Sequence, residues 1–243
     1  MRRDACVKAW SAWAPGTSSP DEWAEWAAGR RVIERSDAAP SLDHLPVLFK
    51  RRLSQVSRMV LHVGHQLSPG PREVKTVYAS EYGEVGRQAA LTASLAGSGE
   101  ISPSAFSLSV FNTPVALLSM AERNTERSVT LNAGPESFET ALWESLALQE
   151  RSGDPEVLMI AADEVVPAPF DELVATPNIP YALGLLLGDG TSGVRLELEM
   201  EFGRRQDDRD ALHPSGLRFL RWFLGDRLEP LRLDHGHCTF SVK

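Results

Sequence analysis

One serine of this chain stands where a nucleophile would be useful. Ser137 lies just after a predicted tight turn, the position that presents the nucleophile in hydrolases. Such enzymes place glycines two residues before and two residues after the serine, but here these positions hold Pro135 and Glu139. The motif fails, and we expect Ser137 to cap or pack a helix.

Histidines occur at two spacings that could serve a metal ion. His62 and His65 lie three residues apart in a predicted helix, but we see no carboxylate or cysteine near them, so we expect structural histidines. Near the C-terminus the order is Asp-His-Gly-His-Cys, in which His235 and His237 would share one face of a strand while Cys238 points to the other. Only two ligands converge there. We predict no metal site and no cofactor.

Acidic residues outnumber basic ones. The chain has 33 Asp and Glu against 25 Lys and Arg, which gives a net charge of −8. This balance argues against a nucleic-acid surface, because such a surface requires a large basic excess. We interpret the neighbouring pairs Asp163/Glu164 and Asp207/Asp208 as loop charge and not as acid–base dyads.

The global numbers are typical of a globular protein. With 243 residues, 42% of them hydrophobic, the chain can bury a sizeable core as one large domain or two small ones. Cys6 and Cys238 lie at opposite ends and predict a reduced, cytoplasmic setting, although a single bridge remains open. No apolar run approaches the ~18 residues of a membrane span, and we see no signal sequence.

The elements around Ser137 give the clearest local pattern. Residues 128–131 alternate like a strand, and a turn follows at Asn132, Gly134 and Pro135. Apolar residues then recur near the helical period up to residue 150. We therefore predict a strand, a sharp elbow and a buried helix.

The rest of the chain reads as alternating strands and helices. Four tryptophans in the first 26 residues predict a packed N-terminal layer, and Asp21 is a candidate cap for its helix. We expect residues 179–190 and 194–202 to pair as an antiparallel hairpin. The other predicted strands are 5–13, 74–83, 155–164 and 230–243, and the other predicted helices are 21–29, 45–67, 84–97, 112–123 and 216–226, the last capped by Ser215.

The strand, elbow and helix resemble the active-site segment of β-ketoacyl synthases, and Asn112 resembles the asparagine of the preceding helix in that family. A gapless count from Asn112 places the family's cysteine at Pro135, and a slip of one residue gives Gly134 or Glu136. None of the three can attack a thioester. A ketosynthase-like chain with such an elbow is similar to a chain length factor, the non-catalytic half of a ketosynthase heterodimer.

The resemblance covers residues 45–200 and includes the run RRLSQVSRM and the apolar strand that ends in Ala-Ala-Asp-Glu. It implies an α/β, thiolase-like layered fold, N-terminal half only, with a mixed five-stranded sheet and helices on both sides. We expect a single domain over residues 1–243, with 204–243 as a small C-terminal addition. The family's catalytic histidines belong to the second half, which this chain would lack.

The resemblance also implies partners. The chain would pair with a catalytic ketosynthase, shape its acyl pocket in aryl polyene or type II polyketide-like biosynthesis, and receive an acyl carrier protein. The basic cluster Lys50, Arg51 and Arg52 is a weak candidate for carrier docking, since a solvated helix end is the commoner role. The implied partner interface consists of Asn112, Ser128, Val129, Thr130, Leu131 and Asn132.

One aromatic residue is a candidate pocket gate. In ketosynthase homodimers an aromatic residue shortly before the asparagine closes the other subunit's acyl pocket. The gapless position is Ala105, and Phe106 takes it if the loop shifts by one residue. A buried core residue is the slightly favoured alternative for Phe106.

Two other functions stay open. The chain could be an independent serine hydrolase or acyltransferase that uses Ser137 or the terminal histidines. It could also be a ligand-binding scaffold with a decayed thiolase-like fold.

Overall fold

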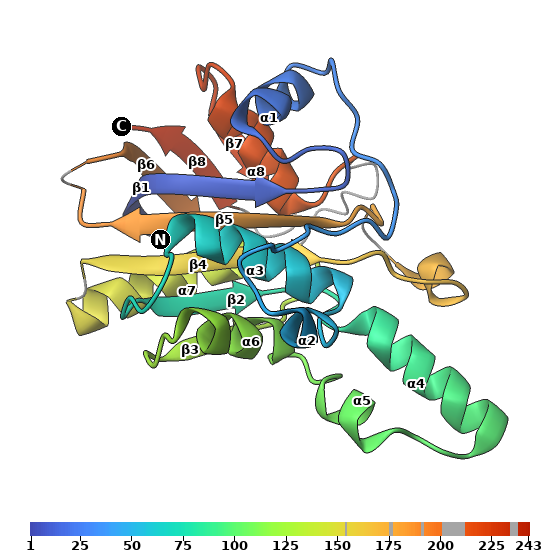
Figure 1. Ribbon diagram of the computed structural model, residues 1–243. Helices are drawn as coiled ribbons and strands as arrows, with labels where there is room; N and C mark the ends of the chain where they lie inside the picture. Colours follow the sequence, from blue (N-terminus) through green and yellow to red (C-terminus); the bar gives the residue numbers. More distant parts are fainter. Residues whose placement is uncertain (154, 175–176, 191, 201–211, 234–237) are drawn as a thin grey trace.

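One mixed sheet of eight strands forms the centre of the protein (Figure 1). The computed structural model describes residues 1–153, 155–174, 177–190, 192–200, 212–233 and 238–243. The sheet order is β3-β2-β4-β5-β1-β6-β8-β7, so the predicted count of five strands is wrong. The strands are β1 (Arg2–Trp13), β2 (Lys75–Ala79), β3 (Ser128–Leu131), β4 (Glu156–Asp163), β5 (Tyr181–Gly188), β6 (Val194–Met200), β7 (Leu231–Leu233) and β8 (Cys238–Val242).

The middle strands are apolar because they are covered on both faces. All eight residues of β5 are buried, as are the six central residues of β4. β3, β2 and β4 run parallel to one another, whereas β5 and β1 are antiparallel to their neighbours. Near-continuous apolar runs of this kind are typical of such covered strands.

The predicted hairpin of the two strands after residue 179 is wrong. β1 lies between β5 and β6 and pairs antiparallel with both, so that Val7 faces Leu187 on one side and Val194 on the other. The connection between β5 and β6 must cross over β1, and a Cβ at Gly193 would lie 2.4 Å from the carbonyl oxygen of Val7. Glycine is required at that close approach. A sequence pattern does not reveal a distant strand that inserts between two neighbours.

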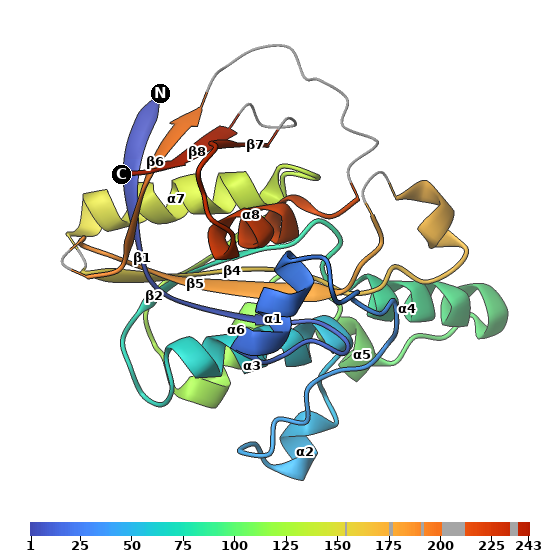
Figure 2. The same cartoon turned by 90° about the horizontal axis from the view of Figure 1, so that it is seen from above.

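Helices cover both faces of the sheet (Figure 2). α7 (Ser137–Ser152) and α8 (Ser215–Leu224) pack on one face, where α1 (Pro20–Ala27) adds the buried Trp23 and Trp26. α3 (Gln55–Leu67) and α6 (Thr113–Glu122) pack together on the opposite face. The tryptophans are thus core residues, as predicted.

Helix boundaries depart from the prediction at three caps. α1 is capped by Ser19, not Asp21, in a capping box with Glu22. The predicted helix 45–67 is two helices, α2 (Val47–Lys50) and α3, because the Ser54 side chain accepts from the Ser57 backbone N–H and starts α3 afresh. Ser215 is the first residue of α8 and makes no cap hydrogen bond.

A helical arm projects from the body of the protein. It comprises α4 (Val85–Ser98) and α5 (Pro103–Ser107), which Figure 1 shows extending away from the sheet. Neither helix contains a buried residue. The sequence pattern predicts a loop over residues 101–106 and an extended segment over 106–111. Both expectations are wrong, since α5 is a short helix whose Ser102 cap accepts from the Ala105 N–H.

The C-terminal elements belong to the same sheet and core. β8 pairs with β6 and with β7, and Leu217, Phe219 and Leu220 of α8 are fully buried. A short 3-10 turn, η1 (Phe170–Leu173), lies in the loop before β5. Among the described residues, no helix has the length and apolarity that crossing a membrane requires.

Candidate functional site: the elbow and the sheet edge

The elbow between β3 and α7 lies where the three parallel strands end. β2, β3 and β4 are in parallel register, so their carboxyl ends meet at one edge of the sheet. Ligands of α/β sheets bind outside this edge. The predicted strand, turn and helix are therefore all present and lie at the place where a reactive group would be useful.

The backbone of the elbow is held by its own side chains. Gly134 adopts a φ of +60°, the left-handed region that glycine tolerates. Its N–H donates to Asn132 Oδ1 at 3.0 Å, while Asn132 Nδ2 donates to the Glu81 carbonyl oxygen at 3.0 Å. The elbow is thereby fixed against the turn that follows β2.

Ser137 serves this local structure. Its Oγ donates to the Gly134 carbonyl oxygen at 2.6 Å and accepts from the Ala133 N–H at 3.0 Å. The hydroxyl also lies 3.3 Å from the Ser80 carbonyl oxygen, so buried Ser137 packs at the start of α7 and holds the elbow through backbone groups; it does not cap the helix, whose N-cap residue is Glu136. The hydrogen bonds do not give Ser137 the histidine or carboxylate that would activate a nucleophile.

Pro135, where a gapless count from Asn112 places the family's cysteine, is half-buried beneath α8. The Ser215 hydroxyl lies 3.5 Å from the Pro135 carbonyl oxygen. A Cβ at the next residue, Gly216, would lie 2.9 Å from Tyr181 Oη and 3.3 Å from the Phe138 ring. The start of α8 thus packs closely on the first turn of α7.

Beneath this contact lies a buried carboxyl group. Glu139 is 1% exposed, and burial raises its pKa to about 7. The Ser215 hydroxyl only partly offsets this effect, and among the described residues neither carboxyl oxygen has a hydrogen-bond partner of good geometry. A carboxyl group in this setting keeps its proton to a higher pH than usual, and it costs stability when it ionises.

The expectation that the pair Asp163/Glu164 is loop charge is wrong. Asp163 Oδ1 accepts from Ser80 Oγ at 2.6 Å and from two backbone N–H groups, which fixes the turn beside the elbow. Glu164 accepts from the N–H groups of Val56 and Gly86 at the starts of α3 and α4. Burial raises the pKa of both carboxyls to about 7. The pair is structural, and no local sequence pattern reveals that the turn and two helix ends converge on it.

The predicted interface residues lie on the outer strand. β3 is the first strand of the sheet order and pairs only with β2 in the described chain. Ser128 and Asn132 are exposed, and the three residues between them are half-buried. Asn112 is also exposed, immediately before α6. This arrangement leaves a sheet edge open to another strand.

Phe106 is not a core residue of this chain. It lies on α5 in the arm and is 59% exposed, so the alternative that we slightly favoured is wrong. Other large apolar side chains of this region are also exposed. They are Leu95, Ile101, Val110 and Met120. A groove of about 550 Å³ runs between the arm and the body and is lined in part by Leu53, Leu91 and Ala105.

The basic cluster closes α2 and begins the turn into α3. Lys50 is half-buried, whereas Arg51 and Arg52 are exposed. Val47 and Leu48, also exposed, lie beside them. Residues 47–52 therefore present both positive charge and apolar surface, and they are far in sequence from the elbow.

The cysteines and histidines fall into separate places. Cys6 and Cys238 are both free and buried, which removes the open alternative of a bridge, and burial raises the pKa of Cys238 to about 12. His235 and His237, like Asp207/Asp208, lie outside the described residues. The expectation that no carboxylate lies near the α3 histidines is wrong: His65 Nδ1 is 2.8 Å from Glu122 Oε1 of α6.

Similarity to known proteins agrees with this geometry. A solved structure titled as the ketosynthase ApeO in complex with its chain length factor ApeC, from Xenorhabdus doucetiae, contains a chain that is 28% identical, with a TM-score of 0.81 and 98% coverage of both chains. The ishigamide ketosynthase/chain length factor is 12% identical with a TM-score of 0.64, covering 82% of this chain and 68% of that one.

A β-ketoacyl synthase from Burkholderia phymatum is 16% identical with a TM-score of 0.62, covering 85% of this chain and 66% of that one. At such identities the last two establish the fold alone. No curated protein matches this chain. The family model described as β-ketoacyl synthase, N-terminal domain, matches residues 23–239, most of the sequence. The chain therefore belongs to the β-ketoacyl synthase N-terminal domain family, with its thiolase-like fold.

Proposed function

We propose that this chain is a non-catalytic chain length factor, which pairs with a catalytic ketosynthase and forms part of the wall of its acyl pocket. The observation that carries the proposal is the elbow. It keeps the strand, the left-handed glycine and the buried helix, yet it holds Pro135 at the cysteine position, and its Ser137 hydroxyl is occupied by backbone groups.

The partner surface is supported by two features on the same side of the chain. The open edge of β3 can accept a strand, because its outward backbone groups have no neighbouring strand in the described chain. The arm adds exposed apolar side chains, among them Phe106 as the candidate gate. Asn112 follows the arm, immediately before α6. Large apolar interfaces are typical of obligate partners.

The pathway is the finer part of the proposal. The near-complete mutual coverage with a chain of the ApeO–ApeC structure supports pairing with a ketosynthase. The aryl polyene or type II polyketide-like setting is what the resemblance of the sequence implies. An acyl carrier protein with an acidic surface would bind at Lys50, Arg51 and Arg52, because the opposite charges are complementary. The partner's cysteine would take the acyl chain and its histidines would assist condensation.

The test compares the chain alone with its complex. The purified chain, the ketosynthase and the two together are incubated with acyl- and malonyl-loaded carrier protein, and products are identified by mass spectrometry. We expect condensation only from the complex, and none when the partner's active-site cysteine is changed to alanine. Condensed product from this chain alone would refute the proposal.

The serine hydrolase alternative has a direct test in the same material. Ser137→Ala should leave condensation by the complex unchanged, since the hydrogen bonds of the hydroxyl go to backbone groups of the elbow and of the neighbouring Ser80 turn. Hydrolysis of an acyl thioester by the chain alone, abolished in Ser137→Ala, would favour the alternative. A well-behaved monomer that binds an acyl ligand without any partner would favour the scaffold.

A further inference from the structure

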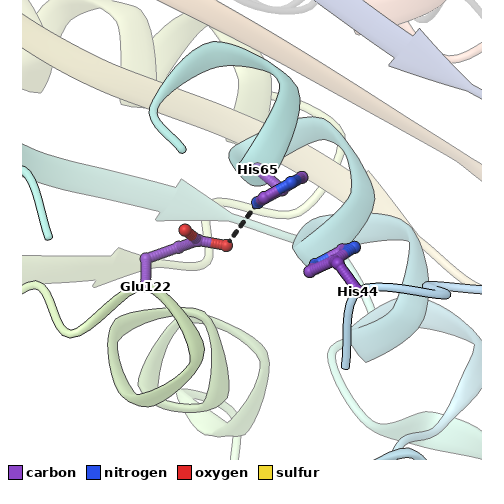
Figure 3. A group of neighbouring side chains, drawn as sticks. All are labelled: His44, His65 and Glu122. Atoms are coloured by element: carbon purple, nitrogen blue, oxygen red, sulfur yellow. Dashed lines mark hydrogen bonds and ion pairs between the residues drawn. The ribbon is translucent and has the colours of Figure 1, made fainter. Parts of the chain in front are cut away.

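A cluster of two histidines and a carboxylate lies on the α3–α6 face, away from the elbow (Figure 3). His65 comes from α3, Glu122 from the last turn of α6, and His44 from the loop before α2. One ligand atom from each lies within 4.8 Å of the other two. Three segments far apart in sequence thus bring metal-binding groups to one place.

The chemistry of these groups suits a borderline divalent ion. Two imidazoles and one carboxylate are the ligand set of several zinc sites, which keep their fourth position for water. We propose that His44, His65 and Glu122 bind a divalent transition-metal ion of the zinc type. Zinc bonds of about 2.0–2.1 Å separate tetrahedral ligands by roughly 3.3 Å, so the three groups need only small movements to surround an ion.

The two fixed ligands are already oriented. Glu122 is 6% exposed, and its Oε2 accepts from the Gly70 N–H, which leaves Oε1 directed at His65 Nδ1, 2.8 Å away. An ion between these two atoms would replace their hydrogen bond, and the proton on His65 Nδ1 would move to Nε2 of the same neutral ring so that Nδ1 can bind the ion. The carboxylate would keep its backbone contact throughout.

His44 is the adjustable ligand. Its ring stacks on that of His65, with the centroids 3.8 Å apart and an angle of 9° between the planes. Because His44 lies exposed on a loop, its ring can turn toward an ion without disturbing the core.

An ion here would act as a clamp. It would tie the loop before α2 to the packed pair α3 and α6, and α2 carries the basic cluster Lys50, Arg51 and Arg52. The clamp would therefore order the approach to that cluster. The elbow does not depend on the ion, so the proposed metal site and the proposed chain length factor role can be tested independently.

The experiment uses the full chain, freed of any histidine tag and stripped with a chelator. Titration with ZnCl2 is followed by calorimetry, and titration with CoCl2 by the visible absorption of four-coordinate cobalt. We expect one ion per chain and a rise in melting temperature with zinc. His44→Ala, His65→Ala and Glu122→Gln should each weaken binding at least tenfold.

Matched controls separate this site from other histidines. His62→Ala removes a histidine one turn away on the same helix, and the pair His235→Ala with His237→Ala removes the terminal ones; both variants should bind zinc as the parent does. Glu122→Gln retains an acceptor for the Gly70 N–H, and circular dichroism checks its fold. Unchanged zinc affinity in the exposed-loop variant His44→Ala would overturn the proposal, as would loss of binding only in the terminal variant.

Discussion

α7 and α4 are helices of similar length with opposite relations to the rest of the chain. α7 has 16 residues and α4 has 14, and both end at a glycine in the left-handed conformation, Gly153 and Gly99. Eight residues of α7 are buried, whereas α4 has none. Propensity and capping explain both helices, but only α7 is held by this chain's own core.

The difference indicates what each region is for. α7 packs against one face of the sheet and contributes to the core there. The arm keeps apolar side chains in water, which a monomer tolerates only in small patches. The inner region is packed into the core of this chain, while the outer region presents apolar surface that the described residues do not cover.

The largest expected effect contrasts one leucine from each helix. Leu142 of α7 is 1% exposed, and Leu142→Ala should cost about 2–5 kcal/mol of unfolding free energy, because a buried cavity adds to the lost transfer energy. Leu95 of α4 is 52% exposed, and Leu95→Ala should change stability by at most about 0.5 kcal/mol. Urea unfolding of both variants measures this; equal losses would show that the arm is packed in solution.

The second prediction concerns a buried carboxyl group of α7, Glu139, and how the stability of the protein depends on pH. Folding raises the pKa of Glu139 from 4.5 to about 7, so the folded state retains a proton that the unfolded state releases between these values. The contribution of this group to the free energy of unfolding is therefore fully present below about pH 4.5. It is lost as the pH rises through 7, by up to about 3 kcal/mol.

Glu139→Gln should remove that loss, and its advantage over the parent should grow from pH 4.5 to 7.5. Asp163 and Glu164 also have raised pKa values, but they are common to both proteins and cancel in the difference. The measurement is the unfolding free energy of both proteins at several pH values. A difference that does not vary with pH would mean that Glu139 remains ionised in the fold.

The third prediction concerns the open edge. Arg127 and Leu131 direct their carbonyl oxygens to β2, so by the alternation of a strand the backbone of Thr130 faces outward. Thr130→Pro should leave the chain folded, because proline is tolerated on an edge with its nitrogen toward solvent. Binding to the ketosynthase should weaken at least tenfold, about 1.4 kcal/mol.

Thr130→Val, which keeps the N–H, is the control for the side chain, and Val129→Pro, which breaks the inward bonds, should destabilise the chain itself. Light scattering of the co-expressed pair gives the stoichiometry, and a titration gives the affinity. A Thr130→Pro chain that still forms the full-strength 1:1 complex would place the interface elsewhere.

Much of the fold follows from local pattern. The apolar runs of β4 and β5, the period of α6 and α7, and the turn at Gly134 each depend on residues close in sequence, and the structure contains all of them. What local pattern does not encode is pairing over long separations. The insertion of β1 between β5 and β6 joins residue 7 to residues 187 and 194, and no periodicity of either segment reveals it.

The site divides in the same way. The failed hydrolase motif around Ser137 is visible in the sequence because it is defined within the elbow, and the structure gives the Ser137 hydroxyl backbone partners there. The burial of Glu139 under Ser215 and the meeting of His44, His65 and Glu122 depend on tertiary packing of distant segments. The exposure of Phe106 was misjudged for a related reason: aromatic residues are buried on average, but the partner that would bury this one is not part of this chain.

The smallest expected change in stability belongs to Phe106, and it tests the outer region most directly. Since 59% of the residue is exposed, Phe106→Ala should alter the unfolding free energy of the isolated chain by at most about 0.5 kcal/mol. A gate that closes the partner's pocket would show itself elsewhere: removing the ring lengthens the pocket, so the complex should remain 1:1 and release longer products. Phe106→Leu, which keeps much of the apolar volume, should shift the products less.

The product distribution is read by mass spectrometry from complexes with the same ketosynthase, and the melting temperature of each complex reports whether the interface survives. A loss of complex without any shift would make Phe106 an interface anchor, and an unchanged distribution in an intact complex would remove it from the pocket.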